Sequence, residues 1–517
     1  MQVFFRVDAS LAAGLGHVMR CLTLAQELRE HGATVSFISR KHPGNLCSVI
    51  EERGFSVSCL PEPATDMVFE DTPAHAAWLG ACWQEDARQT MALLDATIEK
   101  PDWLVIDHYA IDQRWETAVA TSVARMMVID DLADRPHACA LLLDQNLVAD
   151  FDARYSGKVP ATCTTLLGPK YALLQRDYAE LHEADVAFGD PIRRIFVFFG
   201  GADDRNLTGR CLSAFLALGK SDIEIDVVVG VGSPHVSAIR RQIQGHENTH
   251  LHSNLKSLAI LMRQADLAIG AGGTTSWERL CMGLPALVVT LADNQRPIAT
   301  ELNRRRLIRW LGHQDDVTEA DFSQALRELL AQPSLQSEFA SGTQVVDGKG
   351  VHRVWAAMVA VSASNLRVRK ATLADESLLL EWANDPTTRA NGFSCAQITP
   401  QAHGQWFRSR LNNSDDCYLY IVETTGREAL GQVRFERAKA TWVIGYSLAP
   451  VFRGRGLGRP LLDAALLHLR KEERDPCVIG EVKTDNLASC RVFESLGFSA
   501  LGDGRDTVKY IRTIKSA

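Results

Sequence analysis

The sequence predicts an α/β protein with two Rossmann-like lobes, each built on a parallel sheet, followed by a smaller α/β domain. Short buried strands alternate with amphipathic helices through the first half of the chain, which is the pattern of doubly wound sheets. The alternation restarts at Arg194, after the polar, acidic stretch 180–190, and a different pattern follows the small-residue stretch 359–364. The length of 517 residues also favours several domains, which we expect at 1–188, 189–362 and 365–517.

Apolar residues set the expected elements. The first strand is expected at residues 3–5, and the first helix runs from Val18 to Leu28 at helical spacing until Gly32 ends it. In the third region a hairpin replaces the strand–helix alternation. Further strands are expected at 34–38, 104–106, 127–129, 195–199, 227–229, 286–289, 418–423, 431–435, 442–448 and 478–482, with a helix at 376–382 and a hairpin turn at 424–427.

Composition narrows the classes of partner and compartment. The net charge of -8 argues against nucleic acid as a partner, because phosphate backbones recruit basic faces. Twelve cysteines occur without a C-x-x-C pair, so we expect buried reduced thiols and no disulfide framework or metal site. Arg6 and Asp8 stand where a signal peptide would be apolar, and no run reaches the roughly 18 apolar residues of a membrane helix. We therefore expect a cytoplasmic protein without a membrane partner; the sequence indicates no oligomeric state.

The loop between the first strand and the first helix holds candidate catalytic residues. Gly14 and Gly16 allow the backbone to approach a ligand, and the following helix start offers N–H groups to anionic oxygens. His17, in the first turn of that helix, can act as a general base near neutral pH. A tight turn followed by a surface histidine would show the same spacing.

Polar residues also follow two further buried strands. They are Asp107-His108-Tyr109 and Asp130-Asp131, which would lie in ligand-facing loops at the carboxyl edge of the sheet. Asp107 and Asp130 fit the alternative roles of helix cap and turn residue equally well.

A second glycine-rich turn, at residues 268–278 (AIGAGGTTSWE), suits a nucleotide diphosphate because small residues and hydroxyls open its helix. Glu278, one turn into that helix, could accept hydrogen bonds from both ribose hydroxyls. The P-loop pattern G-x-x-x-x-G-K-[ST] is absent. The residues expected to bind the nucleotide sugar are Gly14, Gly16, Gly201, Gly272, Gly273, Thr274, Thr275, Glu278 and Asn294.

Up to about residue 360, the sequence resembles the UDP-sugar hydrolases of pseudaminic acid biosynthesis, which are relatives of B-type glycosyltransferases. The resemblance implies inverting hydrolysis of UDP-2,4-diacetamido-2,4,6-trideoxy-β-L-altropyranose to UDP and free sugar. Because no metal-ligand cluster appears in the sequence, we expect metal-independent chemistry. The resemblance also implies His17 as the base for water, Asp8 as the residue that orients or charge-balances His17, and Tyr109 near the sugar. The segments that carry the resemblance are R-x-D-x-S at 6–10, GLGHVMRCL at 14–22, DHY at 107–109, IDD at 129–131, LGPKY at 167–171 and VDGKG at 346–350.

Residues 453–458 (RGRGLG) follow the expected strand at 442–448 and open an amphipathic helix, so bare backbone N–H groups and arginine charge meet where a pyrophosphate could bind. A strand, an asparagine and a helix ending in Gly-Phe come next. This order resembles the GNAT acetyltransferases, which implies a mixed, mostly antiparallel sheet and acetyl-CoA as co-substrate. The resemblance implies that acetyl-CoA is bound by Leu448, Arg453, Gly454, Gly456, Leu457, Gly458 and Asn486.

One position departs from that family. Phe493 stands where many GNAT enzymes carry a tyrosine that acts as general acid, so the group that returns a proton to the thiolate is unassigned. Trp382, His403 and Trp406 resemble residues of sugar-amine acetyltransferases; they could line the acceptor pocket, or the tryptophans could be core aromatics.

The two resemblances together suggest the acceptor. In the pseudaminic acid route, the 4-amino group of UDP-4-amino-4,6-dideoxy-N-acetyl-β-L-altrosamine is acetylated immediately before the hydrolase step, so the fusion would join consecutive reactions. Two other hypotheses compete with this one. The first is a UDP-sugar-dependent glycosyltransferase with an accessory GNAT domain, and the second is a regulatory protein that binds these ligands without turnover.

Overall fold

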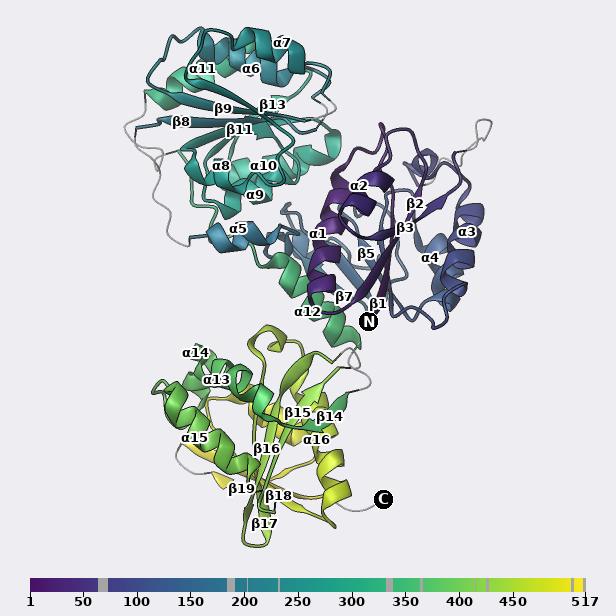
Figure 1. The fold of residues 1–517 in the computed structure, drawn as a ribbon, viewed down its shortest axis with the longest axis vertical. Coiled ribbons are helices and arrows are strands. Elements are labelled where there is room, and N and C mark those ends of the chain that lie inside the picture. Colours follow the sequence, from purple (N-terminus) through teal and green to yellow (C-terminus); the bar gives the residue numbers. More distant parts are fainter. Residues whose placement is uncertain are drawn as a thin grey trace. The chain divides into compact units, whose positions relative to one another are not determined.

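The computed structural model divides the chain into two compact units, Gln2–Val354 and Trp355–Ala517 (Figure 1). The finer domain boundaries expected at 188 and 362 stay predictions. The structure describes residues 1–63, 73–183, 191–201, 203–230, 233–331, 338–362, 366–413, 415–424, 427–503 and 506–514.

The first unit contains two separate parallel sheets, and the first of them has the strand order β3-β2-β1-β4-β5-β6-β7. All five residues of β4 are buried, because helices cover both faces of the sheet. The elements are β1 (Gln2–Val7), α1 (Gly16–Glu30), β2 (Thr34–Arg40), α2 (Cys47–Glu52), β3 (Ser56–Leu60), α3 (Trp83–Asp95), β4 (Trp103–Asp107), α4 (Gln113–Val119), β5 (Arg125–Ile129), β6 (Leu141–Asp144), β7 (Thr164–Leu167) and α5 (Arg176–Leu181).

The register of β1 and β4 positions the first candidate site. Val7 pairs with Asp107, so the residues that follow the two strands emerge side by side at the carboxyl edge of the sheet. Phe4, Leu104 and Ile106 pack with Trp115 of α4 in one buried cluster. Because successive side chains of a strand alternate between the two faces of the sheet, the neighbours of these residues along β1 and β4 point to the other face.

The second sheet has the order β10-β9-β8-β11-β12-β13, and all of its neighbouring strands are parallel. Helices α6, α7 and α11 cover one face, and α8, α9 and α10 cover the other (Figure 1). The elements are β8 (Arg194–Phe198), α6 (Leu207–Leu216), β9 (Glu224–Val229), α7 (Val236–Gln242), β10 (Thr249–Ser253), α8 (Ala259–Gln264), β11 (Leu267–Ala271), α9 (Thr275–Cys281), β12 (Ala286–Thr290), α10 (Arg296–Arg304), β13 (Arg309–His313) and α11 (Glu319–Leu330). Helix α12 (Gly350–Ser362) spans the boundary between the two units, and His352 near its start binds Glu27 of α1.

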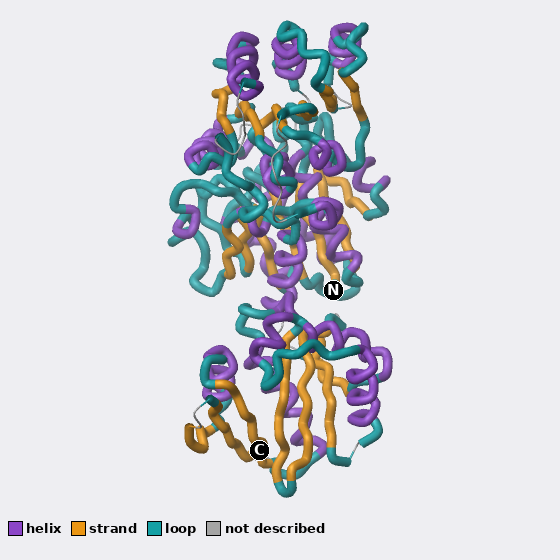
Figure 2. Tube along the Cα trace, turned by 90° about the vertical axis from the view of Figure 1, so that its left-hand side faces the viewer, coloured by secondary structure: helices purple, strands orange, loops and turns teal. Residues whose placement is uncertain are grey.

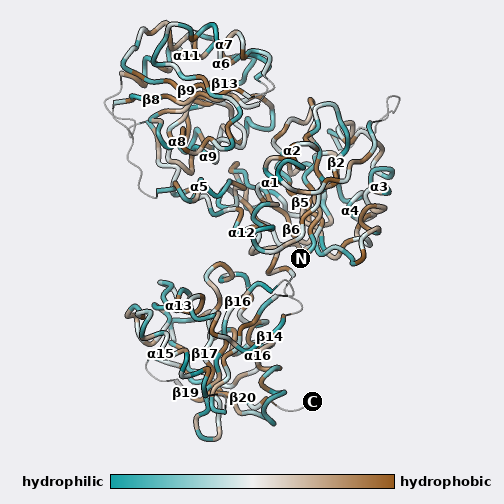
Figure 3. Tube along the Cα trace, viewed as in Figure 1, coloured by the Kyte–Doolittle hydropathy of each residue, from teal (hydrophilic) through white to brown (hydrophobic). Residues whose placement is uncertain are grey.

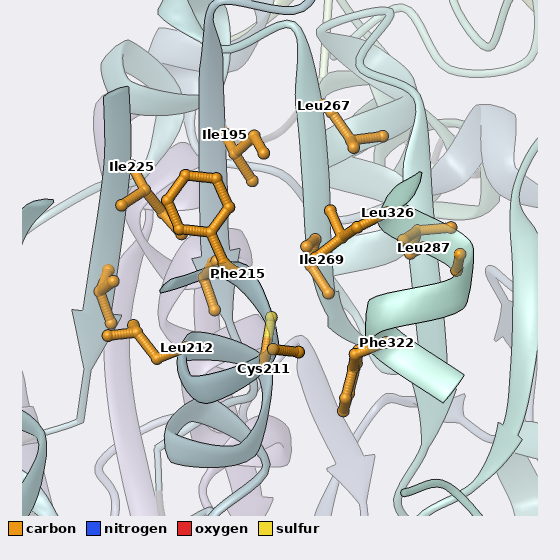
Figure 4. Packing of buried hydrophobic residues seen from close by; sticks show 14 of the residues in the cluster. Ile195, Cys211, Leu212, Phe215, Ile225, Leu267, Ile269, Leu287, Phe322 and Leu326 are labelled. Atoms are coloured by element: carbon orange, nitrogen blue, oxygen red, sulfur yellow. The ribbon is translucent and has the colours of Figure 1, made fainter. Parts of the chain in front are cut away.

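The core of this lobe lies between the sheet and helices α6 and α11. Phe215 and Leu212 of α6 face isoleucines of the strands, and Phe322 of α11 belongs to the same buried cluster (Figure 4). The hydropathy colouring shows the same layering, with apolar strands inside and polar stretches on the outer helices (Figure 3). Burial on both faces therefore explains why these strands read as continuous apolar runs.

The second unit contains one mixed sheet with the order β14-β15-β16-β17-β18-β20-β19 (Figure 2). Among its described pairs, β17 and β18 run parallel and the others antiparallel. The elements are β14 (Arg367–Lys370), α13 (Glu376–Asn384), α14 (Pro386–Asn391), α15 (Pro400–Leu411), β15 (Cys417–Glu423), β16 (Ala429–Ala438), β17 (Thr441–Leu448), α16 (Gly458–Glu472), β18 (Cys477–Lys483), α17 (Leu487–Ser495), β19 (Ser499–Asp503) and β20 (Thr507–Thr513).

One irregularity of this sheet bears on function. In the described pairs, residues Trp442 to Ile444 of β17 pair with residues Val478 to Gly480 of β18. Beyond Ile444 the backbone of β17 still pairs with β16, through to Leu448, but no described pair joins it to β18. The two parallel strands therefore part half-way along β17.

The predicted fold class is confirmed, and each strand expected from the sequence lies within an observed strand or differs from it by one residue. Of the expected hairpin turn, residues 425 and 426 lie outside the described part of the chain. None of the described helices is long and apolar enough to cross a membrane. The cysteines are free, and the expectation of burial fails for Cys59, Cys82 and Cys395, which are exposed.

Phe215→Ala is expected to lower the free energy of unfolding of the first unit by about 3–5 kcal/mol, because the side chain is 1% exposed and its removal leaves a cavity. Urea unfolding followed by circular dichroism measures the change. Leu255→Ala is the matched control, since Leu255 is exposed and its loss should cost no more than about 0.5 kcal/mol. Equal effects of the two substitutions would contradict the core assignment.

Candidate active sites

The ring of His17 is held at the carboxyl end of β4. Asp107, the last residue of that strand, accepts a hydrogen bond from His17 Nδ1 at 2.6 Å. Arg20, one turn further along α1, donates to both oxygens of Asp107, each at 2.6 Å. With Nδ1–H donating to Asp107, Nε2 carries the free lone pair. Arg20 Nη2 also lies 3.2 Å from Nδ1. Within the described residues no hydrogen bond occupies Nε2, so this nitrogen is available to act as a general base.

The charges around Asp107 keep it ionised. Burial would raise the pKa of this carboxyl, but the guanidinium of Arg20, together with His17, outweighs burial and holds the pKa below its usual range. Arg20 also donates a hydrogen bond of 3.0 Å to Asp131, so the positive charge of this arginine is shared by two carboxylates. The sequence prediction missed Arg20. The sequence feature that could have indicated Arg20 is its spacing of three residues from His17, which places both side chains on one face of the helix.

Tyr109 packs against the candidate base. Its ring meets that of His17 edge-on, with 4.6 Å between centroids. Trp78 and His75, which the sequence did not single out, lie 5.9 and 5.5 Å from the Tyr109 ring. The Tyr109 hydroxyl accepts a hydrogen bond of 3.4 Å from Asn294. The structure thus brings together His17, Tyr109 and Asn294, which come from both sheets of the first unit.

The structure contradicts the expectation that Asp8 orients His17. Asp8 Oδ1 accepts from Arg6 and from the backbone N–H of Arg40, both at 2.6 Å. Its Oδ2 faces His108 Nε2 at 3.3 Å. Burial would raise the pKa of Asp8, but Arg6 and the neighbouring histidines hold it well below the usual range. Asp107 is the partner of His17 because β4 ends directly beside the start of α1.

Asp130 is a turn residue, as the alternative interpretation held. Its carboxylate accepts from the backbone N–H of Ala133 and from the Tyr155 hydroxyl, both at 2.9 Å. Asp131 instead points to Arg20. The two neighbouring aspartates therefore serve different purposes, and only the second belongs to the surroundings of His17.

The loop before α1 is open, as its glycines predicted. Gly14 has a φ of +76°, and a Cβ at either Gly14 or Gly16 would meet no atom within 4 Å. Helix α1 begins without a side-chain cap at Leu15. Its first-turn N–H groups are therefore available to an anionic ligand.

In the second lobe, the predicted nucleotide-binding residues follow three neighbouring strands. Gly201 lies just beyond β8, residues 272–275 lead from β11 into α9, and Asn294 lies in a short 3₁₀ turn after β12. Because β8, β11 and β12 are adjacent and parallel, these segments share the carboxyl edge of the sheet.

Glu278 carries a carboxylate oxygen without a partner. Within the described residues, its Oε2 is buried and accepts no hydrogen bond. Burial raises the pKa of Glu278 to about 7, because the opposing effects of Arg279 and Tyr178 do not outweigh the cost of burying the charge. Such an oxygen beside a glycine-rich loop is an acceptor for ligand hydroxyl groups.

Arg279 shapes the same loop and was missed by the sequence prediction. Its side chain is 1% exposed and donates to the carbonyl of Ala271 at 2.8 Å and to Ser276 Oγ at 3.1 Å. Burial lowers its pKa to about 10. No spacing rule marks an arginine that turns inward to bind backbone carbonyls, so the sequence held no usable signal.

In the second unit, the loop before α16 offers bare backbone. Gly454 and Gly456 adopt φ values of +72° and +74°, which favour glycine, and a Cβ at either would meet no atom within 4 Å. Helix α16 follows Leu457 without a side-chain cap, which leaves its first N–H groups for an anion. Gly458 is buried, and a Cβ there would lie 3.0 Å from Val492.

Two of the side chains predicted to bind acetyl-CoA are engaged within the protein. The guanidinium of Arg453 binds the carboxylate of Asp385 and donates to Thr388 at 2.6 Å. Asn486 caps α17 by accepting the N–H of Ser489. The charge of Arg453 is thus paired with Asp385, and its contact with a pyrophosphate stays a prediction. Arg459, in the first turn of α16, is exposed.

The aromatic residues of this unit divide between core and surface. Phe493 is 2% exposed and stacks on Tyr510, with 5.3 Å between ring centroids. Trp382 is a buried core residue, as the alternative interpretation held. Trp406 is half-buried, with the guanidinium groups of Arg410 and Arg434 each 5.4 Å from its ring. Of the two tryptophans, Trp406 is thus the one that an acceptor could reach.

One group of described side chains could hold a metal ion. The ligand atoms of Glu27, His31 and His352 lie within 4.8 Å of one another. Glu27 Oε1 lies 2.6 Å from His352 and 3.3 Å from His31. Burial would raise the pKa of Glu27, but the two histidines lower it to about 2. None of the three belongs to the predicted sites, so metal-independent chemistry stays a prediction.

Two family models match parts of the chain. The glycosyltransferase family 28 C-terminal domain matches residues 194–349, and the acetyltransferase (GNAT) domain matches residues 365–499. The chain therefore combines a glycosyltransferase-like nucleotide-sugar domain with a GNAT acetyltransferase domain.

Three known proteins are similar in sequence. An uncharacterized protein of Methanocaldococcus jannaschii is 23% identical over 533 residues, which cover 98% of each chain. The UDP-2,4-diacetamido-2,4,6-trideoxy-beta-L-altropyranose hydrolase of Campylobacter jejuni is 26% identical over 306 residues, or 59% of this chain and 97% of that enzyme. The spore coat polysaccharide biosynthesis protein SpsG of Bacillus subtilis is 32% identical over 191 residues, or 37% of this chain and 56% of that protein.

Two solved structures align with parts of this chain. MurG of Acinetobacter baumannii aligns over 68% of this chain and 97% of its own, at 15% identity and a TM-score of 0.46. The spermidine N-acetyltransferase of Vibrio cholerae, in complex with CoA and spermine, aligns over 29% of this chain and 96% of its own, at 16% identity and a TM-score of 0.27.

Glu278→Gln is expected to raise the melting temperature above pH 7. Because the folded-state pKa of Glu278 is raised from 4.5 to about 7, folding favours the protonated acid. A cost to the free energy of unfolding therefore builds as the pH rises from 4.5 through 7, and the amide removes it. At pH 8 the substitution should raise the free energy of unfolding by roughly 1–3 kcal/mol, and this increase should shrink toward pH 4.5. Thermal melts at several pH values measure it. Exposed Glu52→Gln is the control, and a pH-independent gain would contradict the assignment.

Proposed function

We propose that the chain is a bifunctional enzyme of pseudaminic acid biosynthesis. The first unit hydrolyses UDP-2,4-diacetamido-2,4,6-trideoxy-β-L-altropyranose with inversion and releases UDP and the free sugar. The second unit transfers an acetyl group from acetyl-CoA to the 4-amino group of the preceding UDP-sugar. The observation that carries the proposal is the His17–Asp107 pair, in which a buried carboxylate holds one ring nitrogen and leaves the other as a base.

The hydrolysis follows from that pair. Water donates a proton to His17 Nε2 as its oxygen attacks the anomeric carbon, and Asp107 stabilises the imidazolium that forms. The bond between the anomeric carbon and the UDP oxygen breaks, and its electron pair leaves with UDP. Attack on the face opposite the leaving group inverts the configuration.

The second lobe serves the leaving nucleotide. Glu278 Oε2, which has no partner among the described residues, accepts the ribose hydroxyls, and the loop at 272–275 holds the diphosphate through backbone and hydroxyl groups. The match of residues 194–349 to a glycosyltransferase domain supports a nucleotide-sugar ligand. The similarity that spans 97% of the Campylobacter jejuni hydrolase supports this sugar and water as the acceptor.

The acetyl transfer follows from the second unit. The backbone N–H groups at Gly454, Gly456 and the start of α16 hold the pyrophosphate of acetyl-CoA. The pantetheine lies along β17 near Leu448, where the strand no longer pairs with β18 and its backbone can bond to a ligand. The amine of the acceptor attacks the acetyl carbonyl carbon, forming the amide and releasing CoA.

His17→Ala is expected to slow UDP release from the diacetamido UDP-sugar by about 100- to 10,000-fold, because water loses its base. Asp107→Asn should also slow it, since the amide no longer stabilises the imidazolium. Coupled detection of UDP measures the rate, with exposed His246→Ala as the control. UDP release by the wild-type chain without any added acceptor distinguishes a hydrolase from a glycosyltransferase. An unchanged rate in His17→Ala would sink the proposed mechanism.

The order of the two reactions is testable in one tube. With the 4-amino UDP-sugar and acetyl-CoA, NMR should show the acetylated UDP-sugar first and the free diacetamido sugar later. In His17→Ala the acetylated UDP-sugar should accumulate, because the acetylation site lies in the other unit. Equal acetylation of peptide N-termini would refute the assignment of the acceptor.

A further inference from the structure

A tyrosine hydroxyl lies where the parallel strands of the second unit part. Tyr446 of β17 comes two residues after Ile444, the last residue that pairs with β18. Its side chain therefore shares the face of Ile444. The hydroxyl donates to Ser489 Oγ in the first turn of α17 at 3.0 Å, and the N–H of Ser489 is in turn bound by Asn486. Strand and helix together fix the position of the hydroxyl.

Phe493 lies on the same side but supplies no hydroxyl. The rings of Tyr446 and Phe493 meet edge-on, with 6.2 Å between centroids. Phe493 is in turn packed among Tyr510 and Phe498. Tyr446 thus borders the side chain that stands at the family's usual acid position, and it carries the group that Phe493 lacks.

The other tyrosines of this unit are placed elsewhere. Tyr510 donates its hydroxyl to Glu494, and Tyr418 donates its hydroxyl to Glu473. Tyr420 lies on β15, edge-on to His468, and its buried hydroxyl has no partner among the described residues. Tyr446 alone belongs to one of the two strands that part.

We propose that Tyr446 is the general acid of the acetyl transfer and protonates the CoA thiolate. The inference rests on the proposed acetyltransferase function of this unit. The acceptor nitrogen forms a bond to the acetyl carbonyl carbon, the carbon–sulfur bond breaks, and its electron pair stays on sulfur. The Tyr446 O–H gives its proton to that sulfur. The phenolate recovers a proton through Ser489 and water, and this proton balances the one that the amine nitrogen loses.

The surroundings keep this acid protonated until it is needed. Burial raises the pKa of Tyr446, and the hydrogen bond to Ser489 reduces that rise without reversing it. The hydroxyl is therefore neutral across the physiological range. The sulfur becomes basic only as the carbon–sulfur bond breaks, so the proton moves late.

Tyr446→Phe in the full-length chain tests the assignment. With the 4-amino UDP-sugar as acceptor, the kcat of CoA release should fall about 100- to 1,000-fold, while KM for acetyl-CoA changes little. The wild-type rate should decline at alkaline pH as the phenol ionises, and this decline should be absent from the variant. Tyr418→Phe, which removes an equivalent hydroxyl from β15, should leave kcat unchanged. Binding of CoA to the variant, measured by calorimetry, shows that its second unit, which contains position 446, is folded.

The outcomes separate the two hypotheses. A Tyr446→Phe variant with the wild-type kcat and the wild-type pH profile overturns the inference and leaves the acetyltransferase function intact. A fall equal to that of Tyr418→Phe would assign both hydroxyls to packing and also overturn it. If the wild-type chain acetylates another amine instead, the same comparison on that amine decides the role of Tyr446. A wild-type chain that acetylates no amine overturns both proposals.

Discussion

The carboxylate of Asp107 is the point on which the geometry of the first unit's candidate site depends. It ends a fully buried strand, and it receives His17 and Arg20 from one face of α1. This attachment holds the start of α1 at the edge of the sheet, and with it the open loop that contains Gly14. The same carboxylate decides which nitrogen of His17 carries the proton. Architecture and acid–base chemistry therefore rely on a single side chain.

A second buried carboxylate, Asp86 of α3, organises the interior beneath the site. It accepts from Arg6 of β1, from Arg40 of β2 and from the indole of Trp115. Burying these charges is costly, and removing one partner would leave another uncompensated. Asp8 is joined to the same network through Arg6. Asp8 follows a strand end, where catalytic residues are often found, but its charge is paired with Arg6, which is part of the buried network.

Much of the fold could be predicted from the sequence, because buried parallel strands and amphipathic helices leave strong periodic signals. The predicted glycine loops also lie at strand ends, where ligands bind. The side-chain partners could not be predicted. Asp8 and Asp107 end neighbouring strands, and the local sequence does not say which of them turns toward α1. Arg453 has the spacing of a phosphate ligand, but Asp385, which is distant in sequence, neutralises it.

Gly480 of β18 is constrained by a contact with α17 that the spacing of residues in the sequence does not reveal. A Cβ at this position would lie 2.5 Å from the ring of Phe493, so the ring occupies the space of the missing side chain. Positions 480 and 493 therefore share one volume. A side chain at position 480 requires the ring of Phe493 to move or a smaller residue at position 493, so substitutions at the two positions are expected to have non-additive effects on stability.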